Sequence, residues 1–154
     1  MCLWRGAWTR SEPTLVSGLD LVDVREVDLS VQRFGERYLR RVYTPQEIES
    51  CGAGGPRFAS RLAARFAAKE AVIKVLRAAE LGVDWRSIEV VRADDGAPSL
   101  RLAGRVAEAA ERQGFFQFSI SLTHETDYAG AVVIGQRREA KKTRSFFRRR
   151  QAWR

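Results

Sequence analysis

The chain of 154 residues is 45% hydrophobic and 30% charged, which suits a single globular domain with a sizeable core. Its formal net charge of +8 resides in residues 137–154, which hold nine Lys or Arg against one acid, Glu139, so residues 1–136 are balanced in charge. This distribution argues against a domain that is basic throughout, as nucleic-acid-binding domains are, and we interpret residues 137–154 as a disordered basic tail.

The cysteines and the apolar stretches exclude further classes of protein. Cys2 and Cys51 are far apart in sequence, with neither CxxC spacing nor a neighbouring histidine, so neither a disulfide framework nor a zinc site is indicated. No stretch approaches the roughly 18 apolar residues of a membrane span, and the N-terminus lacks a continuous apolar core. We therefore expect a cytoplasmic protein that makes no membrane contact.

The first predicted element is a strand. After a loose segment over residues 1–14, residues 15–24 (LVSGLDLVDV) are apolar and β-branched apart from Gly18, Asp20 and Asp23. Asp20 lies between two leucines, where a carboxylate is costly unless a cation or hydrogen-bond donors meet it. A solvated carboxylate at the end of a strand is the alternative.

Two helices are predicted next. Thr44 and Glu47 have the residue types and spacing of a capping box, with Pro45 at the first helical position, so a short helix begins there and ends at the Gly-rich loop 52–56. Residues 57–79 contain no Gly or Pro and are rich in Ala, which predicts a long helix. Its apolar face is formed by Phe58, Leu62, Phe66, Ile73 and Leu76.

The rest of the chain predicts mainly strands. In chain order, we expect a hairpin of residues 87–91 and 99–102 with its turn at 94–96 (DDG), a helix over 105–113, and strands over 116–122 and 129–135. Residues 15–136 are then one domain of the α+β class, a mainly antiparallel sheet packed on the long helix.

Three charged side chains lie close to the apolar face of the long helix. Glu70 lies about 40° from Phe66 on a helical wheel, and Lys74 follows one turn later. These two residues are either functional groups or an ordinary i,i+4 surface ion pair. Lys69 points into the apolar sector, where it either has a role or extends past its apolar neighbours to water.

His124 is the only histidine of the chain and follows the alternating strand. With neither a second histidine nor a reactive cysteine beside it, a hydrolytic triad or a zinc site has little support. A structural histidine is the simpler interpretation of the pattern alone.

Three segments together resemble the motifs of the holo-acyl-carrier-protein synthases, the small 4′-phosphopantetheinyl transferases. They are residues 18–23 (GLDLVD), residues 65–71 (RFAAKEA) with Lys74, and residues 119–124 (SISLTH), in the order and spacing of the family. The second segment is the specific one. The resemblance covers residues 16–135 and implies the 4′-phosphopantetheinyl transferase fold.

This resemblance implies a reaction and a set of roles. The family transfers 4′-phosphopantetheine from coenzyme A to a serine of an acyl or peptidyl carrier protein, releasing 3′,5′-ADP. Asp20 and Glu70 match its metal ligands, and one or two carboxylates beside phosphate oxygens and water suit Mg²⁺. Arg65 and His124 become contacts to the coenzyme A phosphates. Lys74 becomes a second cation on the phosphates, and Glu70 the candidate for taking the serine proton.

The family's members work as trimers with active sites between neighbouring subunits, so the resemblance also implies a homotrimer. The chain departs from the family in three places: residues 77–80 (RAAE) replace a Gly-x-Gly turn, Asp23 replaces a Glu, and Glu26 replaces a basic residue that faces the carrier protein. The carrier preference therefore stays open. A remaining basic face for an acidic carrier, unless these are solvated helix charges, is formed by Arg40, Arg41, Arg57 and Arg61.

Two other functions are compatible with the pattern. One is a non-catalytic carrier-docking module that keeps the fold but has lost productive coenzyme A binding through the altered loop at residues 77–80. The other is nucleic-acid binding by the tail, which predicts salt-dependent binding that is lost when residues 137–154 are removed.

Overall fold

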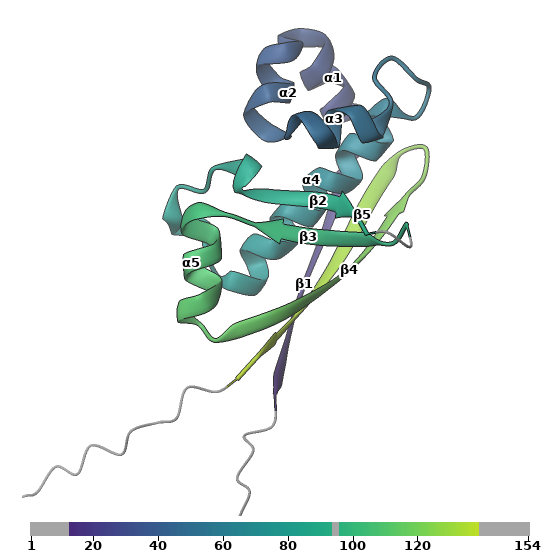
Figure 1. Ribbon diagram of the computed structural model, residues 1–154. Helices are drawn as coiled ribbons and strands as arrows, with labels where there is room; N and C mark the ends of the chain where they lie inside the picture. The colour runs from purple at the N-terminus through teal and green to yellow at the C-terminus, as the bar shows by residue number, and fades with distance from the viewer. Residues whose placement is uncertain (1–12, 94–95, 139–154) are drawn as a thin grey trace, which may run out of the picture.

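The computed structural model describes residues 13–93 and 96–138 (Figure 1). Most of the expected N-terminal segment and basic tail, and the two aspartates of the expected hairpin turn, lie outside the described residues. The elements are β1 (Thr14–Asp23), α1 (Val24–Phe34), α2 (Glu36–Val42), α3 (Pro45–Cys51), α4 (Phe58–Leu76), the short 3₁₀ turns η1 (Ala79–Leu81) and η2 (Trp85–Ser87), β2 (Ile88–Arg92), β3 (Pro98–Leu102), α5 (Gly104–Arg112), β4 (Phe115–His124) and β5 (Tyr128–Arg137). No helix of the described part is long and apolar enough to cross a membrane.

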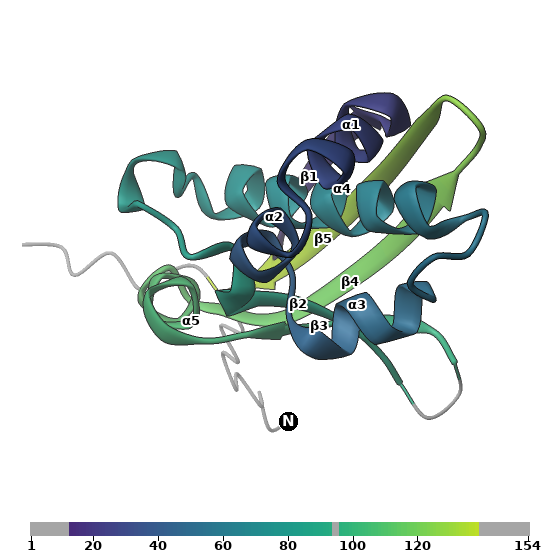
Figure 2. The ribbon, with the colours of Figure 1, turned by 90° about the horizontal axis from the view of Figure 1, so that it is seen from above.

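The long helix α4 packs on one face of a three-stranded antiparallel sheet of order β1-β5-β4, so the expected fold class is confirmed (Figures 1 and 2). Asp20 lies opposite Ala131, and Ala131 lies opposite Leu122. Because residues directly opposite each other in a sheet share a face, all three belong to the face that α4 covers.

The close approach of α4 to β1 depends on Gly18. A Cβ atom at this position would lie 2.2 Å from the carbonyl oxygen of Ala71 and 2.9 Å from Cγ2 of Val75, well inside contact distance. On the helix side, Ala67, Ala68 and Ala71 are fully buried, and their small side chains let the two backbones come together. The apolar cores lie on both sides of this contact.

The segment after β1 is helical, whereas the sequence pattern extended the strand to Val24 and predicted nothing for the following residues. The Asp23 side chain accepts a hydrogen bond from the backbone N–H of Arg25 at 2.8 Å, which caps α1 and turns the chain directly from strand to helix. Gly35, with φ of +53°, separates α1 from α2. The buried face of α1 holds only Val24 and Val27, which is too few for a clear periodic signal.

The predicted capping box of α3 is confirmed. Thr44 Oγ1 accepts from the backbone N–H of Glu47 at 3.2 Å, and Glu47 Oε2 accepts from the backbone N–H of Thr44 at 2.9 Å. Cys51 is the last residue of this helix. Burial raises the pKa of its thiol to about 11, which keeps it in the unreactive form.

The remaining elements agree with the sequence pattern apart from their ends. α4 ends at Leu76 rather than near Ala79, because Arg77 takes a left-handed conformation with φ of +50°. The hairpin of β2 and β3 forms a sheet of its own. In Figure 2 this hairpin and α3 lie along one flank of α4, where β2 contacts both helices.

Substituting Gly18 by alanine is expected to lower the free energy of unfolding by about 1–3 kcal/mol, because the added methyl group overpacks the contact with Ala71. Urea unfolding measures the change. Ser17→Ala, at an exposed neighbour on the same strand, is the control and should stay within about 0.5 kcal/mol of the parent. An unchanged midpoint for Gly18→Ala would mean that β1 can move away from α4 at little cost.

Candidate active site

Asp20, Glu70 and Lys74 meet where β1 crosses α4. The Nζ atom of Lys74 lies 2.7 Å from Oδ1 of Asp20 and donates a second hydrogen bond to the carbonyl oxygen of Leu19 at 2.9 Å. Only 17% of the Asp20 side chain is exposed, against 52% of the Lys74 side chain. Asp20 is therefore not a solvated strand end, and Lys74 pairs across two elements rather than along its own helix.

We refer to Asp20, Glu70 and Lys74 as the carboxylate cluster. Glu70 lies close enough to Asp20 and Lys74 for their charges to shift its pKa. Burial raises the pKa of Glu70, the charge of Asp20 raises it further, and Lys74 partly opposes the shift. Two carboxylates against one lysine leave a net negative charge that can accept a divalent cation. No group of three or more His, Cys, Asp or Glu gathers anywhere in the described ranges, so a cation here would take its other ligands from a bound molecule or water.

A second cluster surrounds a cavity of about 360 Å³ on the opposite flank of α4. Its walls come from α3, α4, β4 and the β2–β3 hairpin, and no Asp or Glu is among the described residues that line it. Its basic lining residues are Arg57, Arg61, Arg65, Arg92 and His124. We refer to it as the arginine cavity. Such a concentration of positive charge suits a ligand with several phosphate groups.

Arg65 is the most buried of these side chains, with 7% of the residue exposed. One Nη atom donates to the carbonyl oxygen of Arg61 at 3.1 Å, and the other donates to Oγ of Ser50 at 3.0 Å. Its Nε–H is buried and finds no acceptor among the described residues. A buried guanidinium with a donor to spare is costly by itself, so an anion in the cavity would satisfy it.

The two clusters lie on opposite sides of the same helix. At 100° per residue, Arg61 and Glu70 lie half a turn apart around α4. The structure thus brings together Asp20, Glu70 and Lys74, and it brings together Arg65 and His124, but it does not join the two groups within one chain.

Asp23 and three arginines of the expected basic face have definite surroundings. Asp23 caps α1, and its carboxylate pairs with the guanidinium of Arg25 at 3.3 Å, which lowers the pKa of Asp23. Arg40 pairs with Glu36 at 2.8 Å and lines a separate depression beside α2 and α3. Arg57 and Arg61 line the arginine cavity instead, so they do not share a depression with Arg40.

Sequence reasoning assigned neither Ser50 nor Arg92 to a site, and it considered Arg57 and Arg61 only as part of a docking face. The spacing of Arg57, Arg61 and Arg65, four residues apart on one helix, was the available signal that they share a flank. No comparable signal exists for Arg92, because its place depends on how the hairpin docks beside α4.

Comparison with known proteins identifies the family of the chain. Residues 17–133 match the model of the 4′-phosphopantetheinyl transferase superfamily. The chain is 43% identical over 116 residues to a holo-acyl-carrier-protein synthase of Gloeobacter violaceus, covering 75% of this chain and 88% of the relative.

Two solved structures extend the comparison. The acyl carrier protein synthase of Mycobacterium tuberculosis superposes with a TM-score of 0.61 at 36% identity, over 79% of this chain and 96% of the other. The holo-acyl-carrier-protein synthase of Helicobacter pylori in complex with coenzyme A gives 0.65 at 28% identity, over 77% and 98%. With its sequence and its fold in agreement, the chain belongs to the 4′-phosphopantetheinyl transferase superfamily and, within it, to the holo-acyl-carrier-protein synthases.

Proposed function

We propose that the protein transfers the 4′-phosphopantetheine group of coenzyme A to a serine of an apo carrier protein, giving the holo carrier protein and 3′,5′-ADP. The observation that carries this proposal is the meeting of Asp20, Glu70 and Lys74 at the family's motif positions. The curated relatives bear the name of this activity, and one similar structure contains coenzyme A, which supports the same co-substrate here.

The chemistry sets what the site must supply. The serine oxygen forms a bond to the β-phosphorus of coenzyme A, the bond from that phosphorus to the oxygen of 3′,5′-ADP breaks, and the serine proton leaves. Because the diphosphate is negatively charged, the protein's main tasks are to hold the reactants in line and to stabilise charge on the phosphate oxygens.

Asp20 and Glu70 would hold Mg²⁺. One carboxylate comes from a strand and one from a helix. Burial and, after it, the charge of Asp20 raise the pKa of Glu70, and a bound cation would relieve both effects. A donor set of only two carboxylates leaves coordination positions for phosphate oxygens and water, as Mg²⁺ sites with nucleotides do. When bound, the ion neutralises charge on the transferring phosphate.

Lys74 and Glu70 are the proposed catalytic residues. The ammonium of Lys74 is half exposed, so it can bind a phosphate oxygen while staying beside Asp20. Glu70 is the candidate for accepting the serine proton, directly or through water, because its carboxylate lies beside Asp20 and Lys74 where the phosphate would bind.

The arginine cavity would hold the nucleotide half of coenzyme A. Arg65 offers its buried Nε–H, and His124 stands at the end of β4 on the cavity wall. Both are proposed to contact the phosphates of the 3′,5′-ADP portion. This assignment explains why the cavity gathers several arginines and no described carboxylate.

A homotrimer would bring the two clusters together. Within one chain they lie on opposite flanks of α4, so a single coenzyme A needs the carboxylate cluster of one subunit and the arginine cavity of its neighbour. The sheet face away from α4 offers a contact surface, because Leu19 and Leu21 on β1 are 63% and 65% exposed, beside exposed Val132 and Ile134 on β5. Apolar faces of this kind mark subunit contacts.

The direct test is mass spectrometry of a panel of apo carrier proteins incubated with the protein, coenzyme A and Mg²⁺. One carrier should gain the mass of a phosphopantetheine group on a serine, and EDTA should abolish the gain. Asp20→Ala and Glu70→Ala should each reduce the rate by about 10²- to 10³-fold while circular dichroism stays unchanged. Full activity in both variants would refute the metal assignment, and no transfer to any carrier would favour a docking module.

The raised pKa of Glu70 predicts that the stability of the protein depends on pH. Since its pKa is raised in the folded state, the metal-free protein should lose stability as pH rises from the ordinary pKa of Glu through the raised value. Glu70→Gln should remove this loss, so in EDTA at neutral pH the variant should unfold at the same or a higher temperature than the parent. Added Mg²⁺ should stabilise the parent alone. Equal stabilisation of the variant by Mg²⁺ would contradict the role of Glu70 as a ligand.

Sharing of the site between subunits predicts complementation. Asp20→Ala and Arg65→Ala chains, each impaired alone, should form active sites when co-expressed, because one subunit then supplies an intact carboxylate cluster and its neighbour an intact cavity. Random mixing should restore about a quarter of the parental sites. Light scattering gives the oligomeric state of each sample. Co-expressed assemblies no more active than the separate variants would show that each chain builds its site alone.

A further inference from the structure

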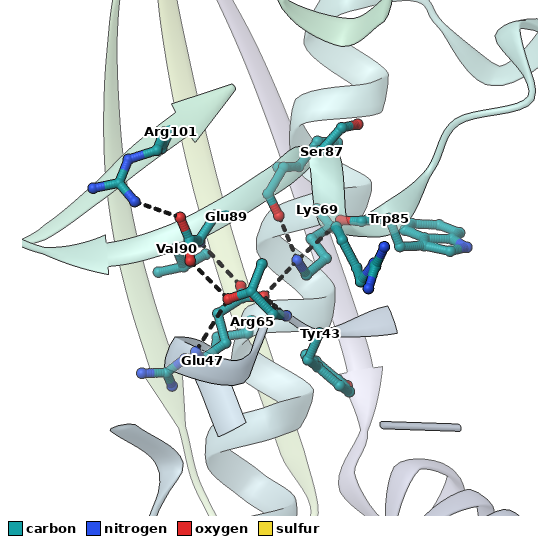
Figure 3. Close-up of polar contacts among 12 residues, drawn as sticks. Tyr43, Glu47, Arg65, Lys69, Trp85, Ser87, Glu89, Val90 and Arg101 are labelled. Atoms are coloured by element: carbon teal, nitrogen blue, oxygen red, sulfur yellow. Dashed lines mark hydrogen bonds and ion pairs between the residues drawn. The ribbon is translucent and has the colours of Figure 1, made fainter. Parts of the chain in front are cut away.

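Lys69 is fully buried on the flank of α4 that bears Arg65, about 40° from it around the helix. Its ammonium donates to Oε2 of Glu47 at 2.8 Å, to the carbonyl oxygen of Trp85 at 3.0 Å, and to the carbonyl oxygen of Ile88 (Figure 3). These acceptors satisfy all of its N–H groups. The interpretation that Lys69 extends to water is therefore wrong, because nothing of its side chain is exposed.

Glu47 is also fully buried, and it connects the ion pair to β2 and to the N-terminal end of α3. Its Oε1 atom accepts from the backbone N–H of Val90 at 3.0 Å, and its Oε2 atom accepts from the backbone N–H of Thr44 as well as from Lys69. The pair thus joins α3, α4 and β2 at one point, as Figure 3 shows.

The connection extends to β3 through Glu89. Its Oε1 atom accepts from the hydroxyl of Thr44 at 2.7 Å, and its Oε2 atom pairs with Arg101 of β3 at 2.8 Å. Both strands of the hairpin are therefore tied to the helices through charged groups.

Stability alone does not account for the buried pair. Removing two charges from water costs several kcal/mol per ion, and well-packed apolar residues of the same volume are often at least as stable. Unlike apolar contacts, charged groups and hydrogen bonds fix the relative positions of the elements that they join. The Glu47 carboxylate does so because it accepts from particular backbone N–H groups of α3 and β2.

The elements that the pair joins are the walls of the arginine cavity. Val90 itself lines the cavity, and Arg92 follows on the same strand. On the helix side, the hydroxyl of Ser50 donates to the carbonyl oxygen of Glu47 at 2.9 Å and accepts from Arg65 at 3.0 Å. Each wall of the cavity is therefore connected to the ion pair through one or two hydrogen bonds.

We propose that Lys69 and Glu47 are positioning residues of the arginine cavity, where their buried ion pair sets the separation of α4 and β2 and thereby the affinity for the 3′,5′-ADP half of coenzyme A. This inference rests on the proposed function. The carboxylate cluster is independent of the pair, because Glu70 lies about 100° further round the helix and β1 is held by the contact at Gly18.

The test uses the full-length double variant Lys69→Met/Glu47→Leu, which removes both charges, keeps the volume and leaves no lone buried ion. Calorimetric titration with 3′,5′-ADP should give a Kd raised about tenfold, and the KM for coenzyme A should rise by about the same factor. The kcat at saturating coenzyme A and the Mg²⁺ concentration for half-maximal rate should stay within about twofold.

Val72→Ala is the matched control, because Val72 is fully buried on α4 in the core away from the cavity. It should lower stability and leave the Kd for 3′,5′-ADP unchanged, which separates positioning from general destabilisation. Glu47→Gln, which keeps one oxygen for Lys69, is a milder second variant and should raise the Kd in the same direction.

A folded double variant or Glu47→Gln variant with parental Kd and KM would overturn the inference. So would a double variant whose kcat and Mg²⁺ requirement change instead, since the pair would then act on the carboxylate cluster. A parent protein that neither binds 3′,5′-ADP nor modifies any carrier would overturn the proposed function and this inference together, whereas a binding parent and an equally binding double variant would overturn the inference alone.

Discussion

The packing of α4 against the sheet is the constraint on which the rest of the structure depends. The helix backbone comes so close to β1 that a Cβ atom at Gly18 would collide with the carbonyl oxygen of Ala71. At this separation a short aspartate on the strand and a lysine on the helix meet directly, as Asp20 and Lys74 do. A wider spacing would leave room for larger core side chains but would place these charged groups beyond contact.

The helix α4 carries charged side chains on two opposite flanks, and the two flanks differ in the sign of their charge. The flank toward β1 carries two carboxylates, Asp20 and Glu70, against the single ammonium of Lys74. The flank toward the hairpin gathers arginines around a cavity. A cation and a polyanion would thus each find a site with the opposite charge, separated by the width of a helix.

The sequence was sufficient to predict the parts that depend on local chemistry. The capping box at Thr44, the long alanine-rich helix and the alternating strand before His124 all follow from nearest neighbours along the chain, and the structure contains them. The helices after Asp23 were not predicted, because they bury few residues and begin within the strand pattern. Neither the burial of Lys69 nor the place of Arg92 could be read from the sequence, since both depend on how the hairpin docks beside α4.

α4 ends at a left-handed residue that is not glycine. Arg77 is the only non-glycine residue in the described part with positive φ, at a cost of roughly 1–2 kcal/mol for a backbone shape that glycine adopts freely. Its cationic side chain stands at the C-terminal end of the helix macrodipole, where the last carbonyl oxygens are negative and a positive charge is favourable. Arg77 therefore adds a permanent positive charge at the C-terminal end of α4, one turn beyond Lys74.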